Sequence, residues 1–248
     1  MNNMQNSIMD KIKNNQLEEN DTFKFGCNQC GECCRNRHDI LLSPYDLYRI
    51  SKYLKMKISG VIEKYCECYI GQDSKLPVVR AKPKTDNFVC PFLNKGKCSI
   101  HEAKPVICAM FPLGRATDSG GCMKYFYSGG CECANKTEVS LKDWIARFKL
   151  KESEQPAKLW GQILAKICTA KMRIKSTQEL ENRFAQIFLM IYLNYTDDEA
   201  FMPQLKKNAE FICFAFEKIY GKSLDDIMNE EECGGLSELC KEKGESCE

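Results

Sequence analysis

Cysteine spacing is the feature that most constrains what this chain can fold into. Seventeen of the 248 residues are cysteines, and twelve of them lie between Phe23 and Cys133. Four occur in the run C-N-Q-C-G-E-C-C, from Cys27 to Cys34. A C-x-x-C pair allows one short loop to place two thiolates on a single metal, and Gly31 allows the backbone to turn sharply between the pairs. The run therefore predicts a metal-binding cysteine domain.

The remaining composition sets the cellular context that we expect. The first twenty residues are polar and mixed in charge, with no apolar core of signal-peptide length. No stretch approaches the roughly 18 to 20 apolar residues of a membrane span. We therefore expect a cytoplasmic protein without a membrane segment, in which clustered cysteines bind metal more often than they form disulfides. The net charge of +2 gives no electrostatic case for nucleic acid as a partner.

A second group of cysteines follows after a gap. Cys90 and Cys98 flank a predicted hairpin with strands at 88–93 and 97–100, and Cys108 follows a proline-bounded turn. The three can converge on one place. Thiolates favour zinc or iron–sulfur centres. We expect the adjacent side chains of Cys33 and Cys34 to diverge, which is awkward for one tetrahedral zinc, so the tight spacing favours an iron–sulfur cluster.

These motifs occur in a fixed order with others. Leu-x-Pro-x-Asp follows at 42–46, then Cys-Pro-Phe-Leu at 90–93, Cys-Ser-Ile-His-Glu at 98–102, and Lys-Pro-x-x-Cys at 104–108 before Phe-Pro-Leu-Gly. The order resembles the YkgJ-type cysteine cluster family, which is described as zinc- or iron-chelating; the flagellin lysine-N-methylases contain a similar cluster. The resemblance covers about Phe25 to Cys131. It implies these metal ligands: Cys27, Cys30, Cys33, Cys34, Cys90, Cys98 and Cys108.

Seven ligands exceed the needs of one centre. A [4Fe-4S] cluster or one zinc uses about four, so either some cysteines are not ligands or there are two centres. We favour one iron–sulfur cluster shared between the two motifs, with a structural zinc as the alternative. The role would be structural or electron-transferring, with a protein partner or substrate. A second function implied by the resemblance is cluster-dependent lysine methyl transfer from S-adenosylmethionine. No glycine-rich nucleotide loop supports ordinary binding of that cofactor, and whether the chain is an enzyme stays open.

For the other cysteines and for His101 the sequence leaves more than one role open. Cys168 and Cys213 lie on apolar helix faces and are expected in the core. His101 is a ligand, a proton carrier or a surface residue, and we favour the surface. Five cysteines form a second site or remain unpaired thiols: Cys66, Cys68, Cys122, Cys131 and Cys133. Three more in the polar tail are accessory ligands or solvated, and we favour solvation: Cys233, Cys240 and Cys247.

The expected fold is α+β and mostly α, with a small irregular metal-stapled domain followed by a helical, bundle-like half. The boundaries are a lead-in at 1–22, the cysteine-cluster domain at 23–135, a helical region at 136–231 and a cysteine-containing tail at 232–248. Ser43, Pro44 and Asp46 predict a capped helix start, and 76–81 a strand. Further helices are expected after Ser59 and at 141–151, 157–170, 178–195 and 204–220.

Overall fold

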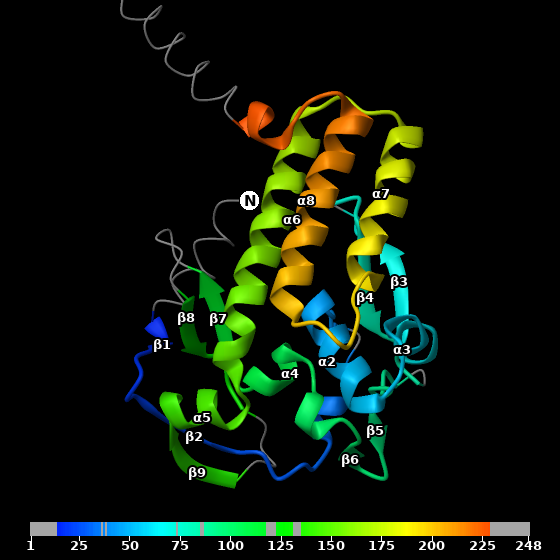
Figure 1. Ribbon diagram of the computed structural model, residues 1–248. Helices are drawn as coiled ribbons and strands as arrows, with labels where there is room; N and C mark the ends of the chain where they lie inside the picture. The colour runs from blue at the N-terminus through cyan, green and yellow to red at the C-terminus, as the bar shows by residue number, and fades with distance from the viewer. Residues whose placement is uncertain are drawn as a thin grey trace, which may run out of the picture. The chain divides into compact units, whose positions relative to one another are not determined.

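A computed structural model describes residues 14–228, apart from residues 36, 38, 73, 85–86, 118–122 and 131–134 (Figure 1). The chain forms two compact units. Unit 1 comprises Met1–Tyr69 and Val78–Lys158, and unit 2 comprises Ile70–Pro77 and Leu159–Glu248. The domain boundaries expected from the sequence stay predictions, and the cysteines of the tail lie outside the described residues.

The first helix predicted with capping signals is confirmed. Helix α2 spans Pro44–Leu54, and Ser43 and Asp46 form a complete capping box at its start. Helix α3 spans Ile58–Tyr65, beginning two residues earlier than expected. Both helices bury their aliphatic stripes, with Leu47, Ile50 and Val61 fully enclosed. These helices form from local signals alone, because the cap and the apolar period coincide.

Strands in unit 1 are short and scattered over four small sheets. The predicted strand is β4, Pro77–Ala81, which pairs with β3, Cys66–Ile70. The predicted hairpin is formed by β5, Leu93–Asn94, and β6, Lys97–Cys98. The other strands were not predicted. They are β1 at Gln16–Leu17, β2 at Thr22–Gly26, β7 at Leu113–Thr117, β8 at Met123–Tyr127 and β9 at Asn135–Ser140.

An aromatic core organises the part of unit 1 beside the cysteines. Strand β2 pairs antiparallel with β9 and buries Phe23 and Phe25 on one face. Both rings pack edge-to-face on Trp144, at centroid distances of 5.8 and 5.4 Å. Trp144 lies on helix α5, Leu141–Arg147, which is shorter than expected because a 3-10 turn, Leu150–Ser153, follows it. The Trp144 indole Nε1 donates to the carbonyl of Met110 at 3.2 Å, which joins this core to the cysteine region.

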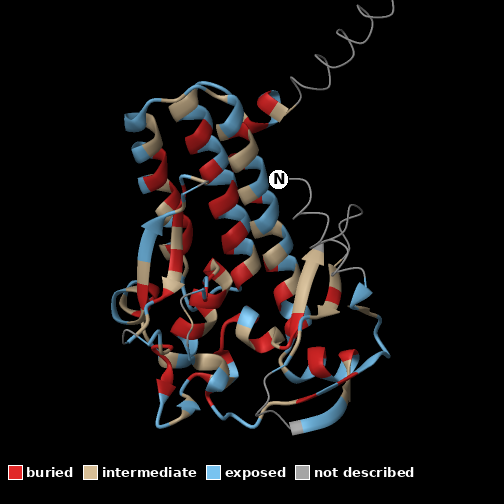
Figure 2. Ribbon diagram, turned by 180° about the vertical axis from the view of Figure 1, so that it is seen from behind, coloured by how far each residue is buried: buried red, intermediate tan, exposed pale blue. Residues whose placement is uncertain are grey.

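Unit 2 is helical. Helix α6 spans Glu154–Arg173, and its residues from Leu159 onward belong to unit 2. It is followed by α7, Gln178–Leu193, and α8, Phe201–Tyr220. Each buries one side and exposes the other, as Figure 2 shows. Helices α6 and α8 each begin three residues before the expected start, because proline is tolerated in the first helical turn, where its missing N–H has no intrahelical partner.

The helical core of unit 2 rests on aromatic side chains. Phe184 packs edge-to-face on Phe216 at 5.3 Å, and Trp160 packs on Phe188 at 5.8 Å. One expectation is wrong: Cys213 is exposed on α8, and Cys168 is only half-buried. The apolar period around both residues is broad, so it did not fix which side faces inward.

The observed elements confirm the α+β, mostly α fold class. Helices dominate, and the sheets are small and irregular. Among the described residues, no helix is both long and apolar enough to cross a membrane.

Candidate metal centre

The first cysteine loop, Cys27–Cys34, is shaped by Gly31. Gly31 adopts a left-handed backbone, φ 77°, and precedes a 3-10 turn over Glu32–Cys34. A Cβ at this position would lie 2.9 Å from the carbonyl oxygen of Gly96 and 2.9 Å from Leu93 Cδ1. Both the conformation and the close approach therefore require glycine. Because Leu93 and Gly96 belong to the β5–β6 hairpin, the same glycine allows the first cysteine loop to pack against the second motif.

Backbone hydrogen bonds join the two motifs directly. The amide of Cys90 donates to the carbonyl of Cys34 at 2.8 Å, and the amide of Arg37 donates to the carbonyl of Phe88 at 2.9 Å. The hairpin then begins where the amide of Leu93 donates to the Cys90 carbonyl at 3.0 Å. Cys90 is thus held beside Cys34 by main-chain contacts, independently of any metal.

Cys108 is positioned through Asp46. Cys108 lies on the short helix α4, Val106–Met110. The amide of Val106, at the start of α4, donates to Asp46 Oδ1 at 2.7 Å, while Asp46 Oδ2 accepts from the amide and the hydroxyl of Ser43 at 2.9 and 2.7 Å. Asp46 is buried. One carboxylate therefore caps two helices, and it fixes the helix that carries Cys108 relative to α2.

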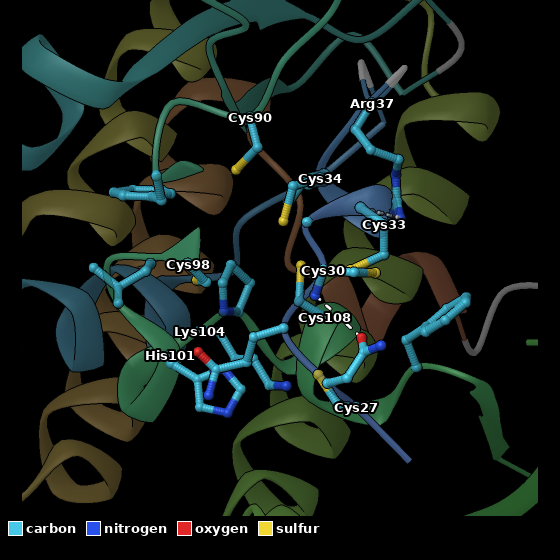
Figure 3. A pocket seen from close by; sticks show the side chains of 18 of the residues that line it. Cys27, Cys30, Cys33, Cys34, Arg37, Cys90, Cys98, His101, Lys104 and Cys108 are labelled. Atoms are coloured by element: carbon cyan, nitrogen blue, oxygen red, sulfur yellow. Dashed lines mark hydrogen bonds between the residues drawn. The ribbon is translucent and has the colours of Figure 1, made fainter. Parts of the chain in front are cut away.

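All seven predicted ligands line one cavity of about 60 Å³ in unit 1. Figure 3 shows their side chains around a common space. The sequence therefore identified correctly which cysteines come together. Apolar side chains complete the walls: Phe25, Ile40, Phe92, Ile100 and Phe111.

Cys34 interacts electrostatically with two neighbouring thiols, those of Cys33 and Cys90. Both Cys33 and Cys34 line the cavity, and the expected divergence of their side chains stays a prediction. Within the described residues, however, no three histidine, cysteine, aspartate or glutamate side chains form a closed metal-binding group. The thiols line the cavity without forming a finished coordination shell.

The thiols have altered proton affinities. A hydrogen bond with Cys34, together with burial, raises the pKa of Cys33. Burial raises the pKa of Cys98, and raises that of Cys108 to about 12. The hydrogen bond from Cys34 instead lowers the pKa of Cys90. Most of these thiols are therefore protonated at neutral pH in the absence of a cation, and a metal must displace their protons to bind.

Two cationic side chains also line the cavity. Arg37 donates from NH1 to the carbonyl of Cys33 at 3.4 Å and pairs with Asp39 at 2.6 Å. Lys104 is 7% exposed, and its ammonium lies 3.8 Å from the ring centroid of Phe148. Burial lowers the pKa of Lys104, and the neighbouring thiols, Cys27 first among them, oppose that shift. Arg37 was not predicted at the site, and Lys104 was named only as part of the Lys-Pro-x-x-Cys motif, because no sequence signal distinguishes a buried lysine from a solvated one.

The remaining candidates lie elsewhere or stay unplaced. Cys66 is buried and Cys68 is exposed on strand β3, and neither lines the cavity. His101 does line it, partly exposed, with its ring 5.9 Å from that of Phe148. The structure thus places His101 at the wall of the cavity. Three cysteines of the predicted domain lie outside the described residues: Cys122, Cys131 and Cys133.

The donor set fits a thiophilic metal, since sulfur ligands select zinc or iron–sulfur centres. Residues 26–143 match the model of the CxxCxxCC family, described as "Putative zinc- or iron-chelating domain". The cysteine-rich segment is therefore similar to this family of domains. The match confirms the cysteine cluster family recognised from the motif order. The CxxCxxCC segment contains the whole cavity except its outermost apolar residue, Phe25.

One curated relative adds to this finding. An uncharacterized protein of Methanocaldococcus jannaschii is 29% identical over 115 residues, which are 42% of this chain. The match spans 58% of that relative's length. No solved structure matches the chain.

Proposed function

We propose that the CxxCxxCC domain holds one compact thiolate-ligated metal centre, an iron–sulfur cluster, in a structural or electron-transfer role. The observation that carries the proposal is the cavity of about 60 Å³ lined by seven cysteines from two separate motifs. Metal binding accounts for this convergence, because seven thiols in one enclosed space have no packing advantage over aliphatic side chains. The bound centre would supply redox chemistry or a structural cross-link between the motifs.

The number and placement of the thiols favour a cluster over a single zinc. A tetrahedral zinc uses about four ligands, usually as two short pairs from separate loops. Here all seven cysteines line one cavity, and Cys34 interacts with both Cys33 and Cys90. A centre with several metal atoms can use such a set more fully than one ion can. A structural zinc is the alternative to the cluster, and analysis of the bound metal distinguishes the two.

Methyl transfer from S-adenosylmethionine gains no support from the cavity. Pockets for ligands of that size usually enclose about 300–1,000 Å³, whereas this cavity measures about 60 Å³. The volume supports a centre of a few atoms. The proposed function is therefore restricted to the metal centre.

Single serine substitutions at the seven cysteines test the proposal. Serine oxygen is a poor ligand for soft metals, so we expect at least about four of the seven variants to lose metal affinity by more than tenfold. Cys213→Ser is the matched control, because this exposed cysteine lies on α8 and does not line the cavity. Metal content after gel filtration is the measurement. Full metal content in all seven variants would refute the proposed site.

A further inference from the structure

Lys104 is a buried cation without an acidic partner. It is 7% exposed, and among the residues that the structure describes, no carboxylate forms an ion pair with it. A buried charge without a counter-charge costs several kcal/mol. Buried lysines are therefore usually paired with an acidic group. The negative charge that stabilises Lys104 must therefore come from a group other than a carboxylate.

The chain holds Lys104 in this position from both sides. Arg49 on helix α2 donates from NH1 to the Lys104 carbonyl at 3.3 Å and from NH2 to the Glu102 carbonyl at 3.4 Å. Phe148, after helix α5, places its ring 3.8 Å from the Lys104 ammonium. Phe148 itself packs on Trp144 at 5.2 Å. The side chain is thus fixed against an aromatic face and is not free to turn toward solvent.

Among the described residues that interact with Lys104, the candidate anions are sulfurs. Lys104 lines the cavity and interacts electrostatically with the thiols of Cys27, Cys33, Cys98 and Cys108. The neighbouring charged groups do not replace them, since Arg49 and Arg147 are cations and Glu102 is exposed. A zinc or a [4Fe-4S] centre with four thiolates carries a net charge of about −2. Such a centre would supply the counter-charge that the protein alone does not.

We infer that Lys104 is a positioning residue that offsets the negative charge of a thiolate-ligated centre and thereby retains it. This inference rests on the proposed function and adds to it that the bound centre is anionic. Arg37, on the opposite side of the cavity in Figure 3, is already paired with Asp39. The main contribution is therefore assigned to Lys104.

The test compares Lys104→Met with Lys104→Arg in the loaded full-length chain. Methionine keeps most of the side-chain volume and removes the charge, whereas arginine keeps the charge. We expect release of metal to a chelator to be about tenfold faster in Lys104→Met, and within about twofold of the original rate in Lys104→Arg. Lys142→Met, an exposed lysine on α5, is expected to leave the rate unchanged. If the centre is an iron–sulfur cluster, a redox titration with dithionite gives a second readout. Lys104→Met is expected to shift the midpoint potential to more negative values, because the reduced centre carries more negative charge and loses a neighbouring cation.

Each outcome bears on the inference separately from the proposed function. If Lys104→Met fails to load metal while Lys104→Arg loads normally, the charge is required and the inference holds. If both variants fail, or if Lys104→Met releases metal at the original rate, the role assigned to the charge is wrong. If the original protein carries no metal at all, the proposed function itself fails.

Discussion

Replacing Asp46 with alanine is expected to lower the free energy of unfolding of unit 1 by about 3–5 kcal/mol. The buried carboxylate accepts from the Ser43 amide, the Ser43 hydroxyl and the Val106 amide, at 2.9, 2.7 and 2.7 Å. Alanine leaves the buried Val106 amide and the part-buried Ser43 donors without this acceptor, and it breaks the capping box of α2 and the contact at the start of α4 together. Because Cys108 lies on α4, we also expect weaker metal retention. Denaturant unfolding of the loaded protein measures the loss.

The chain contains a matched control for Asp46. Ser140 and Asp143 form the same Ser-x-x-Asp arrangement at the start of α5, with hydrogen bonds of 2.7 and 3.1 Å. Asp143 is exposed, and its carboxylate accepts from the Ser140 hydroxyl, whereas the cap of α5 is the Ser140 side chain. Asp143→Ala is therefore expected to cost only about 0.5–1 kcal/mol. Equal losses for the two variants would contradict the dual role of Asp46.

Removal of the metal is expected to have the largest effect of all. Structural zinc contributes apparent binding free energies of about 10–16 kcal/mol in small metal-folded domains, and we expect the cysteine segments to depend on the same kind of cross-link. We expect residues 27–35 and 88–108 to lose protection from amide hydrogen exchange first after chelation. Helices α7 and α8 should remain protected, because their core around Phe184 and Phe216 is formed without cysteines.

Two outcomes decide this prediction. Restoring the metal under reducing conditions should recover the protection of the cysteine segments, which separates metal loss from oxidation. Unchanged exchange in residues 27–35 after complete removal of the metal would show that backbone contacts alone, such as Cys90 to Cys34, hold the site together.

Local signals predicted those parts of the fold that depend on local contacts. The Ser-x-x-Asp spacing of Ser43 and Asp46 predicted a helix start, and Asn94-Lys95-Gly96 predicted a hairpin turn. The α7 and α8 helices followed from their apolar periods. The strands that were missed pair over longer distances: β2 joins β9 across more than a hundred residues. Phe23 and Phe25 alternate with polar residues in β2, which is a strand signal that was available in the sequence.

The candidate site was predictable in its donors but not in its surroundings. Motif spacing identified the seven cysteines that line the cavity. The sequence predicted Asp46 as a cap of its own helix but gave no sign of its bond to Val106, sixty residues away. Lys104 resembles any exposed lysine in the sequence, and only the packing of Phe148 and Arg49 around it shows that it is buried. Long-range contacts of single side chains have no periodic signature.

The most direct test is the metal content and absorption spectrum of protein purified without oxygen. The account predicts about four irons per chain with matching sulfide and a broad band near roughly 400 nm, as for a [4Fe-4S] centre held by cysteines. Colourless protein with about one or two zincs would contradict the iron–sulfur assignment and leave a structural cross-link. Protein that binds neither metal would contradict the central claim.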